Sequence, residues 1–150
     1  MCCHSTSLPQ TFELVGRDRS GNEVRYGFVL RQWFVSRGGK IDNHSNQTTW
    51  CNSLGYRMPR VRDLTNAKCG VAGYEASFPC INGIDGATPS SGTDHYKRHI
   101  GAGFFTEWGY LYYYTDAGFV GNRYWASDAS GSDQFDKFFV DSSYGVDRLH

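Results

Sequence analysis

The stretch "TTWCNSLGYRMPRVRDL", Thr48–Leu64, predicts the end of one short helix, a sharp turn and the start of a second helix. We place the first helix at about 45–54, because Asn43 or Ser45 can accept hydrogen bonds from the unpaired N–H groups of its first turn. Gly55 follows the last turn and can adopt the left-handed conformation that ends many helices. The first helix therefore has recognisable signals at both ends.

The second helix is predicted to begin at Pro59 and to end near Lys68. Proline is favoured in the first turn of a helix, where its missing N–H would have no partner in any case. Apolar residues then recur at every third position, at Val61, Leu64 and Ala67. This spacing predicts a helix that packs one narrow stripe against the core.

The composition favours short strands and turns over a helical bundle. The 150 residues fit one domain, and they include ten Phe, ten Tyr and four Trp beside eighteen Gly. Fifteen basic residues offset fifteen acidic ones, so no global electric field favours nucleic acid as a partner. No segment approaches the roughly eighteen consecutive apolar residues of a membrane span. We therefore expect no nucleic-acid partner and no membrane insertion by this domain.

Two strands are expected before the first helix. They are Thr11–Gly16 and Tyr26–Ser36, and a polar turn centred on Gly21 joins them. The second strand carries apolar residues on both faces, for example Phe28 on one and Val29 on the other. A strand of this kind is usually covered on both sides. Residues 26–36 are therefore predicted to lie in the middle of the domain.

A long irregular excursion, Cys69–Asn122, follows the second predicted helix. A loop of this length inside a compact domain is usually functional. Strands return at Arg123–Asp128 and Phe135–Ser143, and a last short strand is expected after the turn at 142–145. This order of strands, two helices, excursion and further strands predicts the α+β class.

The two ends of the chain carry no clear fold signal. Residues 1–10, "MCCHSTSLPQ", lack the charged start and apolar stretch of a signal peptide, and we interpret them as a linker or a cloning remnant. Leu149 and His150 are interpreted as tag-derived. The domain is therefore expected to occupy residues 11–148.

Five cysteines stand at positions 2, 3, 51, 69 and 80, and their spacing matches no zinc motif. Cys69 and Cys80 bracket a short loop that a disulfide bond would hold in place, so a bond between them is one hypothesis. Cys51 lies among the apolar residues of the first helix and is interpreted as a buried thiol. Three reduced interior thiols are the alternative.

Four short motifs resemble, in chain order, the C-type lectin-like domain that ends the bacterial invasin and intimin adhesins. "WCNSLGYRMP" resembles the helix–turn–helix of that fold, with the pattern aromatic-Cys-x-x-Leu-Gly-x-Arg-[Leu/Met]-Pro. "EWG" and "AGF", followed by "YWAS", resemble its Glu-Trp-Gly motif, its Ala-Gly-aromatic turn and its Tyr-Trp-[Ser/Thr/Ala]-Ser strand. The resemblance covers roughly Phe12–Asp147. It implies two short helices packed on a small twisted antiparallel sheet, with a long irregular loop region that carries the ligand site.

The resemblance does not carry over a calcium site. Sugar-binding C-type lectins use Glu-Pro-Asn or Gln-Pro-Asp followed by Trp-Asn-Asp, whereas this chain offers "YWASD", which ends at Asp128. A Ca²⁺ ion needs several converging oxygen ligands, and Asp128 alone is too few. His95 and His99 lie four residues apart, but such pairs in polar stretches are usually solvated. No Gly-x-Ser-x-Gly elbow is present, so we expect no metal, no cofactor and no catalytic residue.

The aromatic run within the excursion is the candidate binding surface. Exposed tyrosines combine a large rigid contact area with a polar tip, which suits protein interfaces. Trp108 and Phe119 occupy motif positions and are assigned to the core. The candidate partner-binding residues are Tyr110, Tyr112, Tyr113, Tyr114 and Asp116, with a charged rim of Asp94, His95, Tyr96, Lys97 and Arg98.

The resemblance implies a host-attachment domain at the tip of an outer-membrane adhesin, outside the bacterial cell. A β-barrel anchor and immunoglobulin-like domains would precede it in the full-length protein. The expected partner is a host surface or secreted protein, such as an integrin, another receptor or an immunoglobulin. Integrin binding in particular does not carry over, because the family's exposed aspartate has no acidic counterpart in residues 52–59, "NSLGYRMP". A calcium-independent carbohydrate-binding module is the alternative, and an enzyme on the same fold is the third hypothesis.

Overall fold

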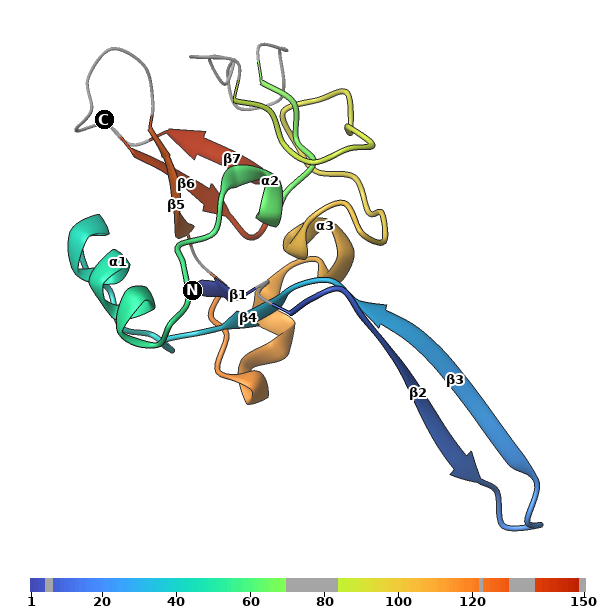
Figure 1. Ribbon diagram of the computed structural model, residues 1–150. Coiled ribbons are helices and arrows are strands. Elements are labelled where there is room, and N and C mark those ends of the chain that lie inside the picture. The colour runs from blue at the N-terminus through green and yellow to red at the C-terminus, as the bar shows by residue number, and fades with distance from the viewer. Residues whose placement is uncertain (5–6, 70–83, 122, 130–136, 149–150) are drawn as a thin grey trace.

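A computed structural model describes residues 1–4, 7–69, 84–121, 123–129 and 137–148 of the chain. Its helices and strands combine in a mixed α+β arrangement with short antiparallel sheets, as the element order predicts (Figure 1). The described sheets pair β1 with β4, β2 with β3, and β5 with β6 and β7. The elements are β1 (Cys2–His4), β2 (Gln10–Arg17), β3 (Glu23–Leu30), β4 (Trp33–Val35), α1 (His44–Ser53), α2 (Val61–Leu64), α3 (Phe104–Trp108), the 3-10 helix η1 (Leu111–Ala117), β5 (Arg123–Ala129), β6 (Lys137–Asp141) and β7 (Gly145–Arg148).

Helix α1 confirms the first predicted helix to within one residue at each end. Of the two candidate caps, Asn43 is the one used, because its side-chain oxygen accepts a hydrogen bond from the N–H of Asn46 at 2.8 Å. Gly55 adopts a φ of 72°, as expected for the residue after the last turn. Local signals alone therefore suffice for this element.

The first residues of the chain belong to the core, so their interpretation as a linker or cloning remnant is wrong for Met1–His4. Strand β1 pairs with β4, with Cys3 opposite Phe34. The side chains of Met1, Cys2 and Cys3 are all buried. Without β1, strand β4 would have no pairing partner among the described residues.

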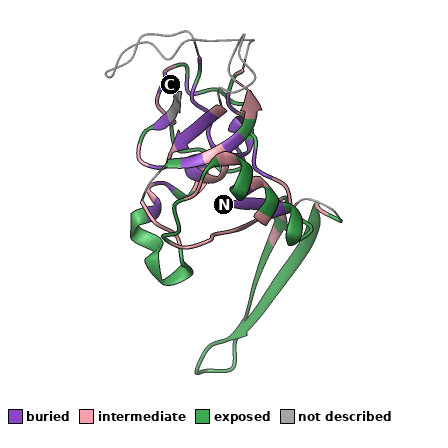
Figure 2. Ribbon diagram, turned by 90° about the vertical axis from the view of Figure 1, so that its left-hand side faces the viewer, coloured by how far each residue is buried: buried purple, intermediate pink, exposed green. Residues whose placement is uncertain are grey.

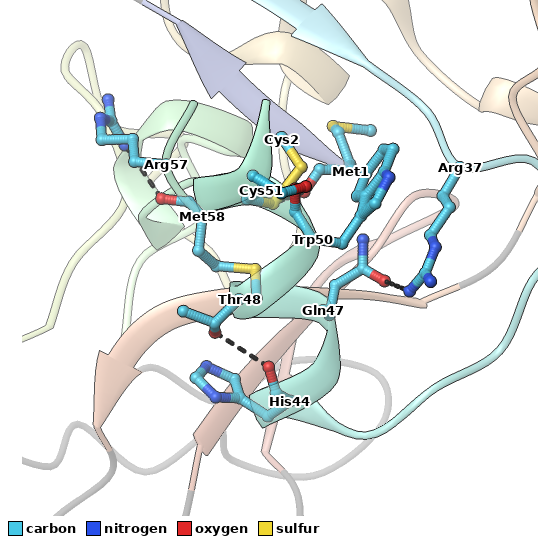
Figure 3. The surroundings of a disulfide bond; sticks show 11 residues. Met1, Cys2, Arg37, His44, Gln47, Thr48, Trp50, Cys51, Arg57 and Met58 are labelled. Atoms are coloured by element: carbon cyan, nitrogen blue, oxygen red, sulfur yellow. Dashed lines mark hydrogen bonds between the residues drawn. A yellow bond between two sulfur atoms is a disulfide. The ribbon is translucent and has the colours of Figure 1, made fainter. Parts of the chain in front are cut away.

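A disulfide bond joins Cys2 to Cys51 across a sequence separation of 49 residues (Figure 3). The interpretation of Cys51 as a buried thiol is therefore wrong. Cys3 is free and buried. The hypothesis of a bond between Cys69 and Cys80 stays a prediction, because Cys80 lies outside the described residues.

The predicted central strand at 26–36 is wrong, because the chain divides it into two strands with different partners. Strand β3 pairs with β2 and forms a hairpin that stands away from the rest of the domain (Figure 1), and most of its residues are exposed (Figure 2). The short strand β4 continues into the core. Between them, the side chain of Gln32 turns toward α2 and donates a hydrogen bond to Asp63 at 2.9 Å.

Helix α2 is shorter than predicted and ends at Leu64, since Thr65 already has an extended backbone. The stripe of Val61, Leu64 and Ala67 is nevertheless buried, with Ala67 beyond the helix. The N–H of Val61 donates to a carboxylate oxygen of Asp128 at 2.6 Å, which ties the start of the helix to strand β5. Tertiary packing and this hydrogen bond thus position α2, which is only one turn long.

The core lies between α2, α3 and the sheet of β5, β6 and β7. Its largest fully buried side chains include Leu64, Phe105 and Phe138. A buried polar group, Asn66, ties the excursion to this core. Its side-chain amide donates to the carbonyl oxygens of Pro89 and Lys97, and its side-chain oxygen accepts from the N–H of Lys97. The described part of the excursion is therefore anchored, although it has little regular structure before α3.

Candidate binding surface

The excursion contains two short helices, α3 and η1, that carry little sequence signal. Both are held by buried anchors, since Phe105 and Leu111 are almost completely inaccessible to solvent. Phe104 adds a stacked contact to Phe34 of β4, with ring centroids 4.5 Å apart. The helices form because these apolar side chains pack into the core, which local propensity does not reveal.

The "EWG" motif connects these two helices. A carboxylate oxygen of Glu107 accepts a hydrogen bond from the N–H of Gly101 at 3.0 Å and fastens the preceding loop. Gly109 has a φ of 83° and ends α3. A side chain at Gly109 would collide with the guanidinium of Arg98, which lies against this turn and donates to the carbonyl oxygen of Glu107 at 2.7 Å. The motif therefore shapes the turn from which η1 projects.

Four exposed aromatic side chains form what we call the aromatic surface, which consists of Trp108, Tyr112, Tyr113 and Tyr114. Their exposed fractions are 49%, 61%, 78% and 36%, respectively. The assignment of Trp108 to the core is therefore wrong, and this residue extends the tyrosine run. Phe119, by contrast, is partly buried and packs against the core as expected.

Ring contacts hold the aromatic surface together. Trp108 and Tyr114 meet edge to face at 5.9 Å, and the hydroxyl of Tyr114 donates to the carbonyl oxygen of Trp108 at 3.0 Å. Tyr110 is half-buried and stacks on Tyr112 at 5.8 Å, while Tyr113 contacts both rings edge to face. Rings that already restrain each other lose less conformational entropy when a partner binds.

The predicted charged rim divides between two places. Arg98 lies beside the aromatic surface through its contacts with Glu107 and Gly109, and Asp116 is exposed on η1 itself. Lys97 is exposed next to Arg98, although its backbone is bonded to Asn66.

The other rim residues contact the turn between β6 and β7. His95 pairs with the buried Asp94 at 2.9 Å and packs edge to face on Tyr144. Tyr96 is half-buried, and its hydroxyl donates to the carbonyl oxygen of Ser142 at 3.3 Å. Within the described part of the chain, no hydrogen bond, ion pair or ring contact joins Asp94, His95 or Tyr96 to the aromatic surface. We therefore restrict the rim of the candidate site to Lys97, Arg98 and Asp116.

The described residues contain no cluster of side chains typical of a metal site. They contain no group of three or more His, Cys, Asp or Glu side chains arranged to hold a metal ion. His95 and His99 make separate contacts, with Asp94 and with the carbonyl oxygen of Ile100. An open hollow of about 560 Å³ borders α1 and α2, and its lining, Thr48, Asn52, Arg57, Met58, Arg60 and Ser127, includes no carboxylate, histidine or cysteine.

A comparison with known proteins finds a similarity to an adhesin. The chain is similar to the inverse autotransporter adhesin YeeJ of Escherichia coli strain K12, with 28% identity over 117 residues. The chain is related to an adhesin. The match covers 77% of this chain but only 4% of the relative, so the chain corresponds to a small part of that protein. No protein-family model matches the chain, and no solved structure matches it. Among the described helices, none is long and apolar enough to cross a membrane.

Proposed function

We propose that this chain is the host-attachment domain of a bacterial surface adhesin and that it binds a host protein through the aromatic surface. The observation that carries the proposal is the exposure of Trp108, Tyr112, Tyr113 and Tyr114 on one short segment, α3 to η1. Tryptophan and tyrosine are enriched among the residues that contribute most to protein–protein binding. The similarity to an adhesin supports an attachment role.

The finer assignment is a C-type lectin-like domain of the invasin and intimin type. The helix pair α1 and α2, the three-stranded sheet β5–β6–β7 and the long excursion between them agree with the arrangement that the sequence motifs imply. In the full-length protein this domain would stand at the outer end of immunoglobulin-like domains on an outer-membrane anchor. A tip position would present the aromatic surface to a host cell.

Binding is proposed to be independent of calcium and to involve no reaction. One carboxylate oxygen of Asp128 already accepts the N–H of Val61, so this side chain has a structural role at the start of α2. Binding by the aromatic surface needs neither a metal nor an acid–base pair. The activity would then be insensitive to EDTA.

A calcium-independent glycan-binding site is the second candidate, because the same rings could stack on sugar faces. Tyr113 is 78% exposed, so most of its side chain is open to a ligand. Tyrosine side chains bind both proteins and glycans, so only the chemical identity of the captured partner distinguishes the two candidates. Protein recognition is favoured because Arg98 and Asp116 add charges of both signs beside the rings.

The proposal predicts that the aromatic surface carries most of the affinity. We expect the triple variant Tyr112→Ala, Tyr113→Ala, Tyr114→Ala to bind its partner at least about 100-fold more weakly, since each lost hot-spot aromatic typically costs about 2 kcal/mol. The immobilised domain is used to capture partners from serum and from solubilised epithelial membranes, with and without EDTA. The affinity of the captured protein is then measured by surface plasmon resonance.

A matched control is available on a different part of the chain. Ile41 and Leu54 are 86% and 47% exposed and flank α1, so the double variant Ile41→Ala, Leu54→Ala removes exposed apolar area without touching η1. It should retain full affinity. Equal affinity of the folded triple variant and the wild type contradicts the protein-binding role of the aromatic surface. Capture of glycoproteins that is lost after deglycosylation supports the glycan alternative instead.

A further inference from the structure

The hairpin of β2 and β3 has one apolar face. The two strands pair in register from Gln10 opposite Leu30 to Arg17 opposite Glu23, and residues directly opposite each other share a face. Alternate pairs therefore place most of the apolar side chains on one side, whereas Val15 and Val29 lie on the other. This apolar hairpin face consists of Phe12, Leu14, Val24, Tyr26, Phe28 and Leu30.

The opposite face of the hairpin is charged and already paired. Arg25 contacts Glu13 at 3.3 Å and Glu23 at 2.6 Å, and Arg17 lies 3.9 Å from Glu23. These charges suit a solvent-facing surface, since they neutralise each other within the hairpin. The hairpin is thus amphipathic: one face carries paired charged side chains that suit contact with solvent, and the other carries apolar side chains that suit burial.

Nothing in the described part of the chain covers the apolar hairpin face. Phe12, Leu14, Val24 and Tyr26 are 40%, 60%, 62% and 65% exposed, and the hairpin projects from the domain (Figures 1 and 2). Phe12 and Phe28 stack on each other at 5.6 Å, but no second layer lies over them. An isolated two-stranded hairpin is marginally stable in water, and a packed layer normally stabilises it.

The charge pattern favours a second copy of the chain as the covering layer. A two-fold interface must bring the same patch of both copies together, and a patch with like charges would repel itself. The apolar hairpin face has no charged side chain. Glu13 and Glu23 balance Arg17 and Arg25 on the other face, and the formal net charge of the whole chain is zero. No electrostatic repulsion therefore opposes the association of two copies.

The size of the face allows a weak dimer. With roughly 150–250 Å² for a large apolar side chain, its exposed fractions amount to about 400–500 Å² per copy. Two copies would bury about 800–1,000 Å², and the upper end of this range reaches the lower limit of about 1,000 Å² for a specific interface. Because the hairpin projects from the domain (Figure 1), two hairpins can be placed face to face with the two domain bodies at opposite ends.

We propose that the chain forms a two-fold dimer in which the apolar hairpin faces of two copies pack against each other. This inference is independent of the proposed host-protein site, since η1 takes no part in it. Face-to-face sheets pack about 10 Å apart, so the six apolar side chains of each copy interdigitate. The dimer would present two aromatic surfaces at once and increase the avidity for a clustered host protein.

Two neighbouring substitutions on the same strand test the proposal. Leu14→Glu places a charge on the apolar hairpin face, whereas Val15→Glu places the same charge on the opposite face beside Arg25. The two parent residues are similarly exposed, at 60% and 53%. Sedimentation equilibrium of the full chain from micromolar to millimolar concentration should show a dimer for the wild type and for Val15→Glu. Leu14→Glu should raise the dimer dissociation constant by about 100-fold or more, since it buries two unpaired charges.

A second measurement separates loss of association from fraying of the hairpin. A photo-crosslinking phenylalanine analogue at position 14 should yield covalent dimers whose crosslinks map to residues 10–30 of the other copy, and the same analogue at position 15 should not. A wild-type chain that stays monomeric up to millimolar concentration overturns the proposal and leaves the face to a different protein. A dimer that Leu14→Glu leaves intact, or crosslinks that map outside the hairpin, also overturns it.

Discussion

The double variant Cys2→Ser, Cys51→Ser is expected to unfold with a free energy about 4 kcal/mol lower than the wild type. The bond closes a loop of 49 residues, and the entropy that such a crosslink removes from the unfolded chain corresponds to about 4 kcal/mol. Both sulfur atoms lie in the core, and neither cysteine is exposed to solvent. The bond also fastens β1 to α1, which no other described covalent link does (Figure 3).

Urea denaturation without reductant measures this effect. Cys3→Ser is the matched control, because Cys3 is next to Cys2 and buried but free. Burial raises the pKa of the Cys3 thiol to about 11, an effect that Arg57 only partly opposes. Cys3 therefore stays protonated at neutral pH and does not exchange with the neighbouring disulfide bond. A loss below about 1 kcal/mol in the double variant would show that the bond does not restrict the unfolded chain as this account requires.

Asp63→Ala is expected to lower the free energy of unfolding by about 3 kcal/mol. The carboxylate of Asp63 is 3% exposed and accepts hydrogen bonds from Arg57 at 2.7 Å, from Arg60 at 3.1 Å and from Gln32 at 2.9 Å. Removal of one partner of a buried pair typically costs about 3–5 kcal/mol. We expect the lower end of this range, because the side chains of Arg57 and Arg60 are 38% and 50% exposed and can be partly rehydrated.

The same carboxylate makes stability depend on pH. Burial alone would raise the pKa of Asp63, but the hydrogen bonds from Arg57, Arg60 and Gln32 outweigh it and hold this pKa well below its usual range. The unfolded chain takes up a proton near pH 4, whereas the folded chain does so only at much lower pH. The stabilisation is therefore complete above about pH 5 and is lost as the pH falls toward the folded pKa.

Denaturation series between pH 7 and pH 2 test this dependence. The wild type should lose stability toward acid more steeply than Asp63→Asn, which has no charge to titrate at this position. Asp116→Asn is the control, since Asp116 is exposed on η1, and its pH profile should follow that of the wild type. Parallel profiles for wild type and Asp63→Asn would mean that the ion pairs with Arg57 and Arg60 do not contribute to folding.

The parts of the fold that sequence reasoning predicted are those with local signals. Helix α1 has a cap at Asn43 and a stop at Gly55, and both act in the structure as predicted. The apolar stripe of α2 is buried as expected. The two short helices of the excursion could not be predicted in this way, since Phe105 and Leu111 direct them only through packing with distant residues.

Two errors had a common origin in the exclusion of residues 1–10. Once Cys2 and Cys3 were set aside, Cys51 had no visible partner and residues 33–35 had no strand to pair with. Residues 26–36 were predicted as one central strand because apolar residues lie on both faces, but β3 ends at Leu30, and its pairing with β2 puts Val24, Tyr26, Phe28 and Leu30 on one face and Val29 on the other. An amphipathic hairpin and a buried strand both contain many apolar residues, and only the pairing distinguishes them.

The tyrosine run was identified from composition, whereas Trp108 was missed. Its place in a family motif suggested a core position, yet the turn at Gly109 directs the indole to the surface beside Tyr114. The positions of Asp94 and His95 at the β6–β7 turn were also not predictable, because sequence proximity to Arg98 does not establish which neighbours a loop residue contacts.

Attachment of domain-coated beads to epithelial cells tests the central claim, that the chain binds a host protein, most directly. Beads are compared on untreated cells, on cells treated with trypsin and on cells whose glycans are oxidised with periodate, each with and without EDTA. The account predicts that trypsin abolishes attachment, whereas periodate and EDTA leave it unchanged. Beads that carry the Tyr112→Ala, Tyr113→Ala, Tyr114→Ala variant should not attach. Attachment that survives trypsin but is lost after periodate or in EDTA would contradict it.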